Sequence, residues 1–321
     1  MVLSIIIVNY HSLELIESCL KSIKKYPPNI SFEIVIVNND SNKEKFLNFK
    51  KKHKELTCIQ NSGNWGFSSG CNLGAKSSSG KYLLFLNPDT EINESMAIDK
   101  MIAAMESIEN IGICGCKILD SNKQEENFFW NSPWFFIKTL KQIHFLLFKR
   151  FIDKQFSKDS RKWDVEMVSG AALCISSIDF NTLSGFKDDV YWMYSEDRDL
   201  CFRMIKKLRK RIVKIRDCEI FHSWGGASIS SDSLIMEVEL LISRHNFIIE
   251  NTSGFSKLLL LLMYVFKNVF IPFFKLALNQ VFLKKDKIEK YKKNLQEILS
   301  YYQYCIKNRT WKSKRIKNEK R

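Results

Sequence analysis

Glycine and proline are scarce in this chain of 321 residues, which contains 12 Gly and 5 Pro. A low-complexity linker or a sandwich with many tight turns would need more of both residues. Apolar residues make up 45% of the chain and charged residues 26%, and these fractions support a substantial core rather than disorder. The length fits one large domain, or a main domain with an appendage.

Paired cysteines are also absent, because the nine cysteines stand singly and form no CxxC motif. This spacing excludes a disulfide framework and indicates a reduced, cytosolic chain. Cys114 and Cys116 are close together, but they lie in an apolar run that predicts a buried strand rather than a metal site. Residues 3–8 are too short an apolar run for a signal peptide, so we expect none at the start.

Positive charge is in excess, with 50 Lys and Arg against 35 Asp and Glu. Most of this excess lies in residues 284–321, which hold 11 Lys and 3 Arg against 4 acidic residues. A nucleic-acid binder is one class that such charge suggests. However, the positive charge follows an apolar stretch and does not cover a face that also carries stacking aromatic residues. This arrangement indicates that the partner is a membrane surface rather than a nucleic acid.

Short apolar runs alternate with helical patterns through residues 1–120, which is typical of βα units around a mainly parallel sheet. The predicted strands are residues 3–8, 32–37, 57–60, 81–86 and 111–117. Helices are expected after a Ser12 cap, after a Ser41/Glu44 capping box, within the Gly-rich residues 66–79, and over 94–106. Further strands are expected over 165–175, 212–215 and 219–221.

Two segments near the middle and end of the chain are strongly apolar or aromatic. Residues 128–151 either border a substrate site, touch lipid or form an ordinary helical subdomain. Residues 257–283 are long enough to span a membrane but contain Lys267, Pro272 and Lys275, so an interfacial or re-entrant helix pair fits better. A helical lid or an oligomer interface is the competing interpretation.

Polar clusters stand where the strands of a parallel sheet should end, which is where such sheets bind ligands. These clusters are Asn9-Tyr10, Asn38-Asn39-Asp40-Ser41, Asn87-Pro88-Asp89 and His222. Each could be an ordinary turn. Together, Asp89 and a distant His could ligate Mg or Mn beside a diphosphate.

An acidic run, Tyr194-Ser195-Glu196-Asp197-Arg198-Asp199, opens an amphipathic helix. The apolar period places Asp197 on the buried face, while Asp199 points elsewhere. A carboxylate that faces a cleft and is kept ionised by the helix N-terminus suits a proton acceptor. The alternative is an ordinary first-turn cap.

The glycine-rich segment 64–74 matches neither the dinucleotide fingerprint nor the P-loop spacing. It is either a loop that lets the backbone approach a ligand closely or a set of glycines that serve helix packing.

These motifs, in this order, resemble the glycosyltransferase family 2 enzymes of the GT-A fold, and most closely their bacterial rhamnosyltransferase-like branch. The resemblance covers about residues 2–228. It rests on Ser4-Ile5-Ile6-Ile7-Val8-Asn9-Tyr10, Val37-Asn38-Asn39-Asp40-Ser41, Asn64-Trp65-Gly66-Phe67, Leu86-Asn87-Pro88-Asp89-Thr90, Val168-Ser169-Gly170-Ala171, Met193-Tyr194-Ser195-Glu196-Asp197-Arg198-Asp199-Leu200-Cys201 and His222.

The resemblance implies an α/β GT-A fold, with a Rossmann-like mainly parallel sheet flanked by helices, and a role for each motif. Asp197 would be the general base, with Glu196 beside it to orient or tune it. Asp89 and His222 would bind a divalent metal, Mg or Mn, on the donor diphosphate. The nucleotide-sugar site would comprise Asn9, Tyr10, Asn38, Asn39, Asn64, Gly66, Phe67, Asn72, Asn87 and Gly170. Asn38 and Asn87 depart from the family, which usually has Asp at both places, so base contacts and metal dependence can differ.

The resulting hypothesis has two parts, residues 1–250 as a GT-A glycosyltransferase domain and residues 251–321 as a helical, membrane-associating region. The resemblance implies inverting transfer of a sugar from dTDP-rhamnose to a lipid-linked or cell-surface glycan precursor such as O-antigen. The expected location is peripheral, on the inner face of the cell membrane. A non-catalytic nucleotide-sugar-binding adaptor, a transferase for another sugar and a homo-oligomer are left open.

Overall fold

The computed structural model describes residues 1–125, 162–223, 233–279 and 285–316. The segment 128–151 therefore lies outside the described residues. The strands are β1 (Leu3–Asn9), β2 (Phe32–Asn38), β3 (Thr57–Gln60), β4 (Tyr82–Leu86), β5 (Thr90–Ile92), β6 (Ile111–Leu119), β7 (Lys162–Asp164), β8 (Ala172–Ser176) and β9 (Arg211–His222).

Helices alternate with the strands in the first half of the chain and dominate the last third. They are α1 (Leu13–Lys25), α2 (Lys43–Lys52), α3 (Gly66–Lys76), α4 (Ala97–Ser107), α6 (Ser177–Thr182), α7 (Glu196–Arg203), α8 (Ser233–Asn251), α9 (Gly254–Val265), α10 (Ile271–Asn279) and α11 (Lys285–Asn308). Short π-helical segments follow α7, at Met204–Leu208, and α9, at Phe266–Phe270.

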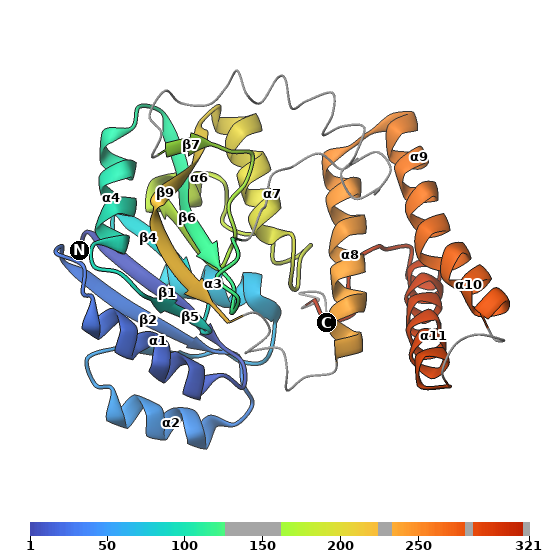
Figure 1. Ribbon diagram of the computed structural model, residues 1–321, viewed down its shortest axis with the longest axis horizontal. Coiled ribbons are helices and arrows are strands. Elements are labelled where there is room, and N and C mark those ends of the chain that lie inside the picture. Colours follow the sequence, from blue (N-terminus) through green and yellow to red (C-terminus); the bar gives the residue numbers. More distant parts are fainter. Residues whose placement is uncertain (126–161, 224–232, 280–284, 317–321) are drawn as a thin grey trace.

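The strands form one mixed sheet in the order β3-β2-β1-β4-β8-β6-β9-β5, with β7 paired to β9 (Figure 1). The pairs among β1 to β4 are parallel, as the alternating pattern predicts, and β6 is parallel to β9. The strands β8, β5 and β7 pair antiparallel with their neighbours. Because β8 runs against its neighbours, its first residue lies at the edge where β1, β4 and β9 end.

The strand pattern differs from the expectation in the second half of the sheet. Residues 165–171 are not strand, so β8 is shorter than the predicted run. The two runs predicted at 212–215 and 219–221 form one strand, β9, which shifts register against β6 between Cys116 and Lys117. An irregularity of this kind lets one strand continue past polar residues that a sequence pattern reads as a break.

The residues that cap α1 and α2 also differ from the predicted ones. Ser12 precedes α1 but makes no side-chain cap, and its hydroxyl donates to Asn9 Oδ1 instead. Asn42, not Ser41, caps α2 and accepts a hydrogen bond from the Lys45 backbone N–H. Both helices nevertheless occur where the apolar period places them.

Separate apolar cores cover the two faces of the sheet. One face packs against α1, α2 and α4, and the other packs against α3, α6 and α7. A third core joins α8, α9 and α11 to Val190 and Tyr191, which precede α7. These C-terminal helices stand together beside the sheet (Figure 1), so the segment before α7 connects the sheet to the helical group.

The apolar segment near the C-terminus is one helical run rather than the predicted pair. Among the described residues, only the helix Gly254–Phe274 is long and apolar enough to cross a membrane. A π-helical segment, Phe266–Phe270, precedes Pro272, and helical residues continue on both sides of it. Leu260 and Tyr264 are buried, while an exposed apolar stripe covers the outer side, comprising Phe255, Leu258, Leu262, Phe266, Phe270, Ile271, Phe273 and Phe274.

Candidate active site

A cavity of about 540 Å³ lies at the edge of the sheet where β1, β4 and β9 end, with α3, α7 and α8 around it. Most of the residues predicted from the sequence contribute to its lining. These are Tyr10, Asn39, Asn64, Gly66, Phe67, Asn87, Asp89, Gly170, Glu196, Asp197 and His222. Residues far apart in the sequence therefore meet at one site.

Three predicted residues do not line this cavity. Asn9 and Asn38 are fully buried and hydrogen-bond to each other, and Asn38 Nδ2 also donates to Gln60 Oε1 at 2.9 Å. Asn72 donates to the Phe186 carbonyl at 2.8 Å and accepts from the Phe186 N–H at 2.9 Å. In this structure these amides hold neighbouring backbone segments in place, and direct ligand contacts by them stay predictions.

Asp89 and His222 come together because β5 pairs with the end of β9, with Thr90 opposite His222. Asp89 Oδ1 lies 3.2 Å from His222 Nε2, and Asn87 Nδ2 lies 3.3 Å from the same nitrogen. Both Asp89 and His222 are buried, with 6% and 8% of their surface exposed. The site thus presents one carboxylate, one imidazole and one amide.

This donor set fits part of a Mg or Mn site. Such ions bind through one or two carboxylates and take their remaining oxygens from substrate phosphates and water. Across the described ranges, no group of three or more His, Cys, Asp and Glu forms a complete cage. The residues at the edge would therefore need a diphosphate to complete the coordination.

Gly66 begins α3 and brings this helix against the loop before α7. Its φ is +89°, and the following N–H, that of Phe67, donates to the Trp192 carbonyl at 2.9 Å. Asn39 Nδ2 donates to the Gly66 carbonyl at 2.8 Å. A Cβ at position 66 would lie 2.0 Å from the Trp192 oxygen, so only glycine fits this close approach.

The turn before α7 holds two successive residues, Tyr194 and Ser195, at φ of 70° and 63°. Non-glycine residues rarely adopt this left-handed conformation, and clusters of such residues are typical of functional sites. The turn places Asp197 in the cavity wall, where Oδ2 accepts the Gly170 N–H at 2.9 Å and Oδ1 accepts the Arg198 N–H at 2.7 Å. Gly170 therefore positions the proposed base.

Glu196 and Asp197 form a carboxyl pair with unlike environments. Burial, and then the neighbouring charge of Asp197, raises the pKa of Glu196 to about 8. Burial also raises the pKa of Asp197, against which its two backbone donors act. Glu196 Oε2 has no hydrogen-bond partner among the residues that the structure describes. Burial and the charge of Asp197 thus favour the neutral form of Glu196, while the two backbone donors favour the charged form of Asp197.

Asp199 is the one acidic residue of this run whose expected direction was wrong. It is fully buried, and its Oδ2 lies 2.6 Å from Arg203 Nε, one helical turn away. Arg203 also donates to the carbonyls of Leu183 and Gly185. Asp199 therefore fixes α7 against the loop after α6, and it lies outside the cavity.

Several residues that line the cavity were not predicted from the sequence. Trp192, Arg198, Met236, Leu240 and Arg244 all line the cavity. The aromatic residues just before the acidic run were a usable signal for Trp192. The three α8 residues recur every four positions, but their direction depends on how α8 packs, which the sequence does not indicate.

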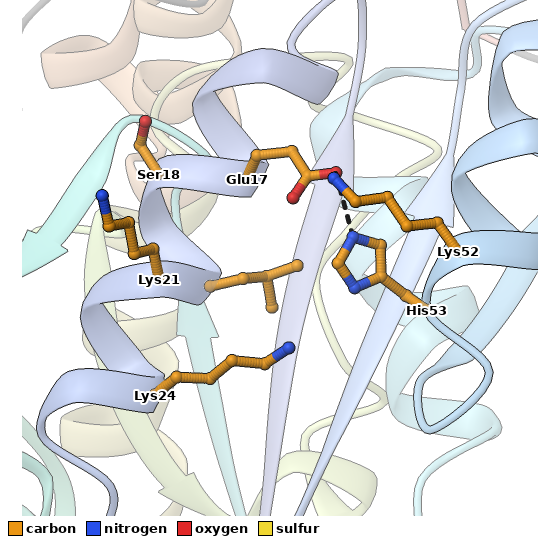
Figure 2. A pocket seen from close by; sticks show the side chains of 7 residues that line it. Glu17, Ser18, Lys21, Lys24, Lys52 and His53 are labelled. Atoms are coloured by element: carbon orange, nitrogen blue, oxygen red, sulfur yellow. Dashed lines mark hydrogen bonds and ion pairs between the residues drawn. The ribbon is translucent and has the colours of Figure 1, made fainter.

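A second hollow, of about 410 Å³, lies between α1 and the end of α2 (Figure 2). Three of the cationic groups that line it have acidic partners, and of these Lys52 Nζ and His53 Nε2 lie 2.8 Å and 2.9 Å from Glu17 Oε1. Lys24 Nζ lies 3.2 Å from Glu55. None of the residues predicted to do chemistry lines this hollow.

Comparisons with known proteins agree on one family and one fold. The family model described as Glycosyl transferase family 2 matches residues 4–165. The low-salt glycan biosynthesis hexosyltransferase Agl10 of Haloferax volcanii is 26% identical over 259 residues, which cover 79% of this chain and 77% of that protein.

Solved structures of low identity share the fold. The mannosyltransferase PcManGT from Pyrobaculum calidifontis, in complex with GDP-Man and Mn²⁺, superposes with a TM-score of 0.55 at 12% identity, covering 96% of this chain and 82% of that chain. A segment of S. aureus TarS in complex with UDP-GlcNAc gives 0.53 at 16% identity, covering 94% and 81%.

Proposed function

Because this chain belongs to glycosyl transferase family 2 and is a glycosyltransferase of the GT-A fold, we propose that it transfers a sugar with inversion from a nucleoside diphosphate to a hydroxyl of a glycan precursor. One observation carries the proposal. A single cavity holds a carboxylate suited to act as base, Asp197, and a candidate diphosphate site, Asp89 with His222.

The proposed step uses Asp197 as the general base. Its carboxylate accepts the proton of the acceptor hydroxyl while that oxygen bonds to the anomeric carbon. The bond from this carbon to the diphosphate oxygen breaks on the opposite face, and the electron pair leaves with the nucleoside diphosphate. Glu196, protonated at neutral pH, keeps a second negative charge away from the base.

Asp89 and His222 would hold a divalent ion, Mg or Mn, on the donor diphosphate. When bound, such an ion neutralises negative charge that develops on the leaving diphosphate. Asn87 lies against His222 and fixes the orientation of its ring. The Mn²⁺ present with GDP-Man in the Pyrobaculum structure supports this assignment.

The donor site lies between Tyr10, Asn39 and the start of α3. The Haloferax relative is a hexosyltransferase and the two solved neighbours carry GDP-Man and UDP-GlcNAc, which supports a hexose or deoxyhexose donor. The narrower proposal is dTDP-rhamnose, and it rests on the ordered motifs of the rhamnosyltransferase-like branch.

The acceptor is proposed to be a lipid-linked precursor met at the cytoplasmic face of the membrane. The exposed apolar stripe supports this proposal, because eight large apolar side chains on one helix are 39% to 78% exposed. The excess of Lys and Arg in residues 284–321 adds attraction to anionic lipid. The Haloferax relative acts in glycan biosynthesis.

A donor screen tests this function. The melting temperature of the purified protein is measured with dTDP-rhamnose, GDP-mannose, UDP-GlcNAc and UDP-glucose, each with Mn²⁺, with Mg²⁺ or with chelator. We expect one nucleotide sugar to raise the melting temperature with metal, and we expect Asp89→Asn to weaken this effect. If none of these nucleotide sugars raises the melting temperature, the result contradicts the proposed function.

A further inference from the structure

The C-terminal segment, residues 310–316, returns from the end of α11 to α8 and to the loop before α7 (Figure 1). The Trp311 carbonyl accepts the hydroxyl of Tyr301, a buried residue of α11, at 2.8 Å. Ser313 and Ile316 are also buried, with 4% and 7% of their surface exposed. The C-terminal segment is therefore packed into the protein and lies close to the elements that form the cavity.

Glu239 of α8 binds the C-terminal segment beside the cavity wall. Its Oε1 accepts the Ser313 hydroxyl at 2.7 Å and lies 3.2 Å from Arg315 Nε. Glu239 is 3% exposed, and the next residue, Leu240, lines the cavity. Because a buried carboxylate is costly without such partners, these contacts fix where the Arg315 side chain lies.

Arg315 lies over the ring of Trp192, which belongs to the loop before α7. The guanidinium carbon is 5.3 Å from the centre of the ring. The Arg315 side chain is 34% exposed, whereas Trp192 is 6% exposed and lines the cavity. A guanidinium is attracted to the face of an indole ring, and the attraction is stronger where water is excluded. The contact therefore limits the movement of the Trp192 ring.

Trp192 in turn holds the start of α3, which belongs to the proposed donor site. Its carbonyl accepts the Phe67 N–H at 2.9 Å, and its Nε1 donates to the Asn64 carbonyl at 3.4 Å. A Cβ on Gly66 would meet the same Trp192 carbonyl at 2.0 Å. Asn64, Gly66 and Phe67 all line the cavity. A shift of Trp192 would therefore displace the start of α3 and the donor site with it.

We infer that Arg315 is a positioning residue for the donor site, which holds Trp192 against the start of α3 and so raises the affinity for the nucleotide sugar. The inference rests on the proposed function and adds the C-terminal segment to the parts that build its donor site. Arg315 does not belong to the cavity lining, so its effect on the donor passes through Trp192.

Calorimetric titration of the full chain tests the inference. The probes are dTDP-rhamnose, GDP-mannose, UDP-GlcNAc and UDP-glucose with Mn²⁺, and the one that the wild-type protein binds most tightly is used for every variant. The test variant is Arg315→Gln. The matched control is Lys312→Gln, because Lys312 also forms an ion pair from the C-terminal segment, with Asp189 Oδ2 at 2.8 Å, but neither residue lines the cavity.

We expect Arg315→Gln to bind this nucleotide sugar about threefold to tenfold more weakly, with an unchanged number of sites per chain. The number of sites separates positioning from loss of structure, because unfolded protein lowers that number and leaves the affinity of the remaining sites unchanged. Lys312→Gln should stay within about twofold of the wild-type affinity. An unchanged affinity in Arg315→Gln, fewer sites at the wild-type affinity, or an equal loss in Lys312→Gln overturns the inference.

A second comparison tests whether Arg315 acts through Trp192. In the background of Trp192→Leu, Arg315→Gln should change the affinity by less than about twofold, because the ring under the cation is gone. A larger further loss overturns the inference. If Trp192→Leu does not fold, Arg315→Lys takes its place, since it keeps a cation near the ring and should bind more tightly than Arg315→Gln. Equal binding by Arg315→Lys and Arg315→Gln then overturns the inference.

Failure of the inference is distinguishable from failure of the proposed function. If the wild-type protein binds none of the nucleotide sugars, the proposed function fails. If it binds one of them and Arg315→Gln binds it equally well, the proposed transferase stands, and its donor site does not depend on the C-terminal segment.

Discussion

At the scale of single residues, α7 carries two aspartates whose surroundings differ completely. Asp199 is fully buried and paired with Arg203, whereas Asp197 is partly exposed in the cavity and accepts hydrogen bonds from two backbone N–H groups, at 2.9 and 2.7 Å. The apolar period of the sequence does not separate them correctly, because it places Asp197 rather than Asp199 on the buried face. Only the partners that the fold supplies separate a structural carboxylate from a candidate base.

Substitution at the two positions should therefore change the free energy of unfolding by different amounts. Asp199→Asn leaves Arg203 as an uncompensated buried charge, and we expect a loss of about 3 to 5 kcal/mol in the free energy of unfolding. Asp197→Asn keeps an acceptor oxygen for one of the two backbone donors and turns its NH2 toward the other, so we expect a smaller loss of about 1 kcal/mol. Urea unfolding of both variants measures this. Equal losses would show that the pairing with Arg203 contributes no particular stability.

Glu196 gives a prediction about pH. The folded protein holds the Glu196 proton up to a pKa of about 8, whereas the unfolded chain releases it near 4.5. The stability that this proton contributes is present at low pH and is lost as pH rises across that window. Relative to Glu196→Gln, the wild-type free energy of unfolding should fall by up to about 1.4 kcal/mol per pH unit.

Urea unfolding of the wild-type protein and Glu196→Gln at several values of pH measures this difference. Glu44→Gln, which replaces an exposed carboxyl group of α2, is the matched control. A pH dependence for Glu196→Gln no larger than that of the control would mean that Glu196 is ionised in the folded protein.

At the scale of elements, the sequence predicted β1 to β4 and the helices between them because a buried parallel strand is a continuous apolar run. It could not predict β8 as a short antiparallel strand, because an apolar run does not show direction. β9 was divided in two where polar residues coincide with a register shift. The helix over Gly254–Phe274 was predicted as part of a pair because Lys267, Pro272 and Lys275 interrupt the apolar run, whereas the structure continues through a π-helical segment at Phe266–Phe270.

Gly66 at the start of α3 tests how closely two elements must approach. In Gly66→Ala the new Cβ meets the Trp192 carbonyl at 2.0 Å, at a backbone φ of +89°. We expect a loss of about 3 kcal/mol in stability, together with weaker nucleotide binding. Thermal unfolding and a nucleotide titration measure the two effects.

Gly254 at the start of α9 is the matched control. It also has positive φ, +58°, but a Cβ there meets nothing within 4 Å. Gly254→Ala should therefore lose only about 1 kcal/mol and leave nucleotide binding unchanged. If the two variants behave alike, the close approach of α3 to Trp192 is not what requires glycine.

At the scale of the whole molecule, the C-terminal helices are packed into the enzyme. Leu260 and Tyr264 of α9 share a core with Phe247 of α8 and with Tyr191 before α7. Removing residues 256–321 would expose this core and disturb the segment that leads to Asp197. Membrane attachment is therefore better tested by substitutions on the outer face of α9.

The variant Leu258→Ser with Leu262→Ser removes two side chains that are 54% and 58% exposed. Its affinity for vesicles of phosphatidylcholine and phosphatidylserine should fall by about tenfold or more, because each buried leucine contributes about 1.5 to 3 kcal/mol. Flotation of the vesicles measures it. Leu47→Ser with Ile178→Ser, 54% and 74% exposed elsewhere, is the matched control. If the wild-type protein, the stripe variant and the control bind the vesicles with equal affinity, the stripe does not contribute to membrane binding.

Single-turnover transfer by Asp197→Asn tests most directly whether this cavity transfers a sugar with Asp197 as its base. With the donor that the screen identifies, we expect the rate to fall by about 10² to 10⁴, while nucleotide affinity and stability stay near those of the wild-type protein. Transfer at the wild-type rate by Asp197→Asn would contradict the claim and place the base elsewhere.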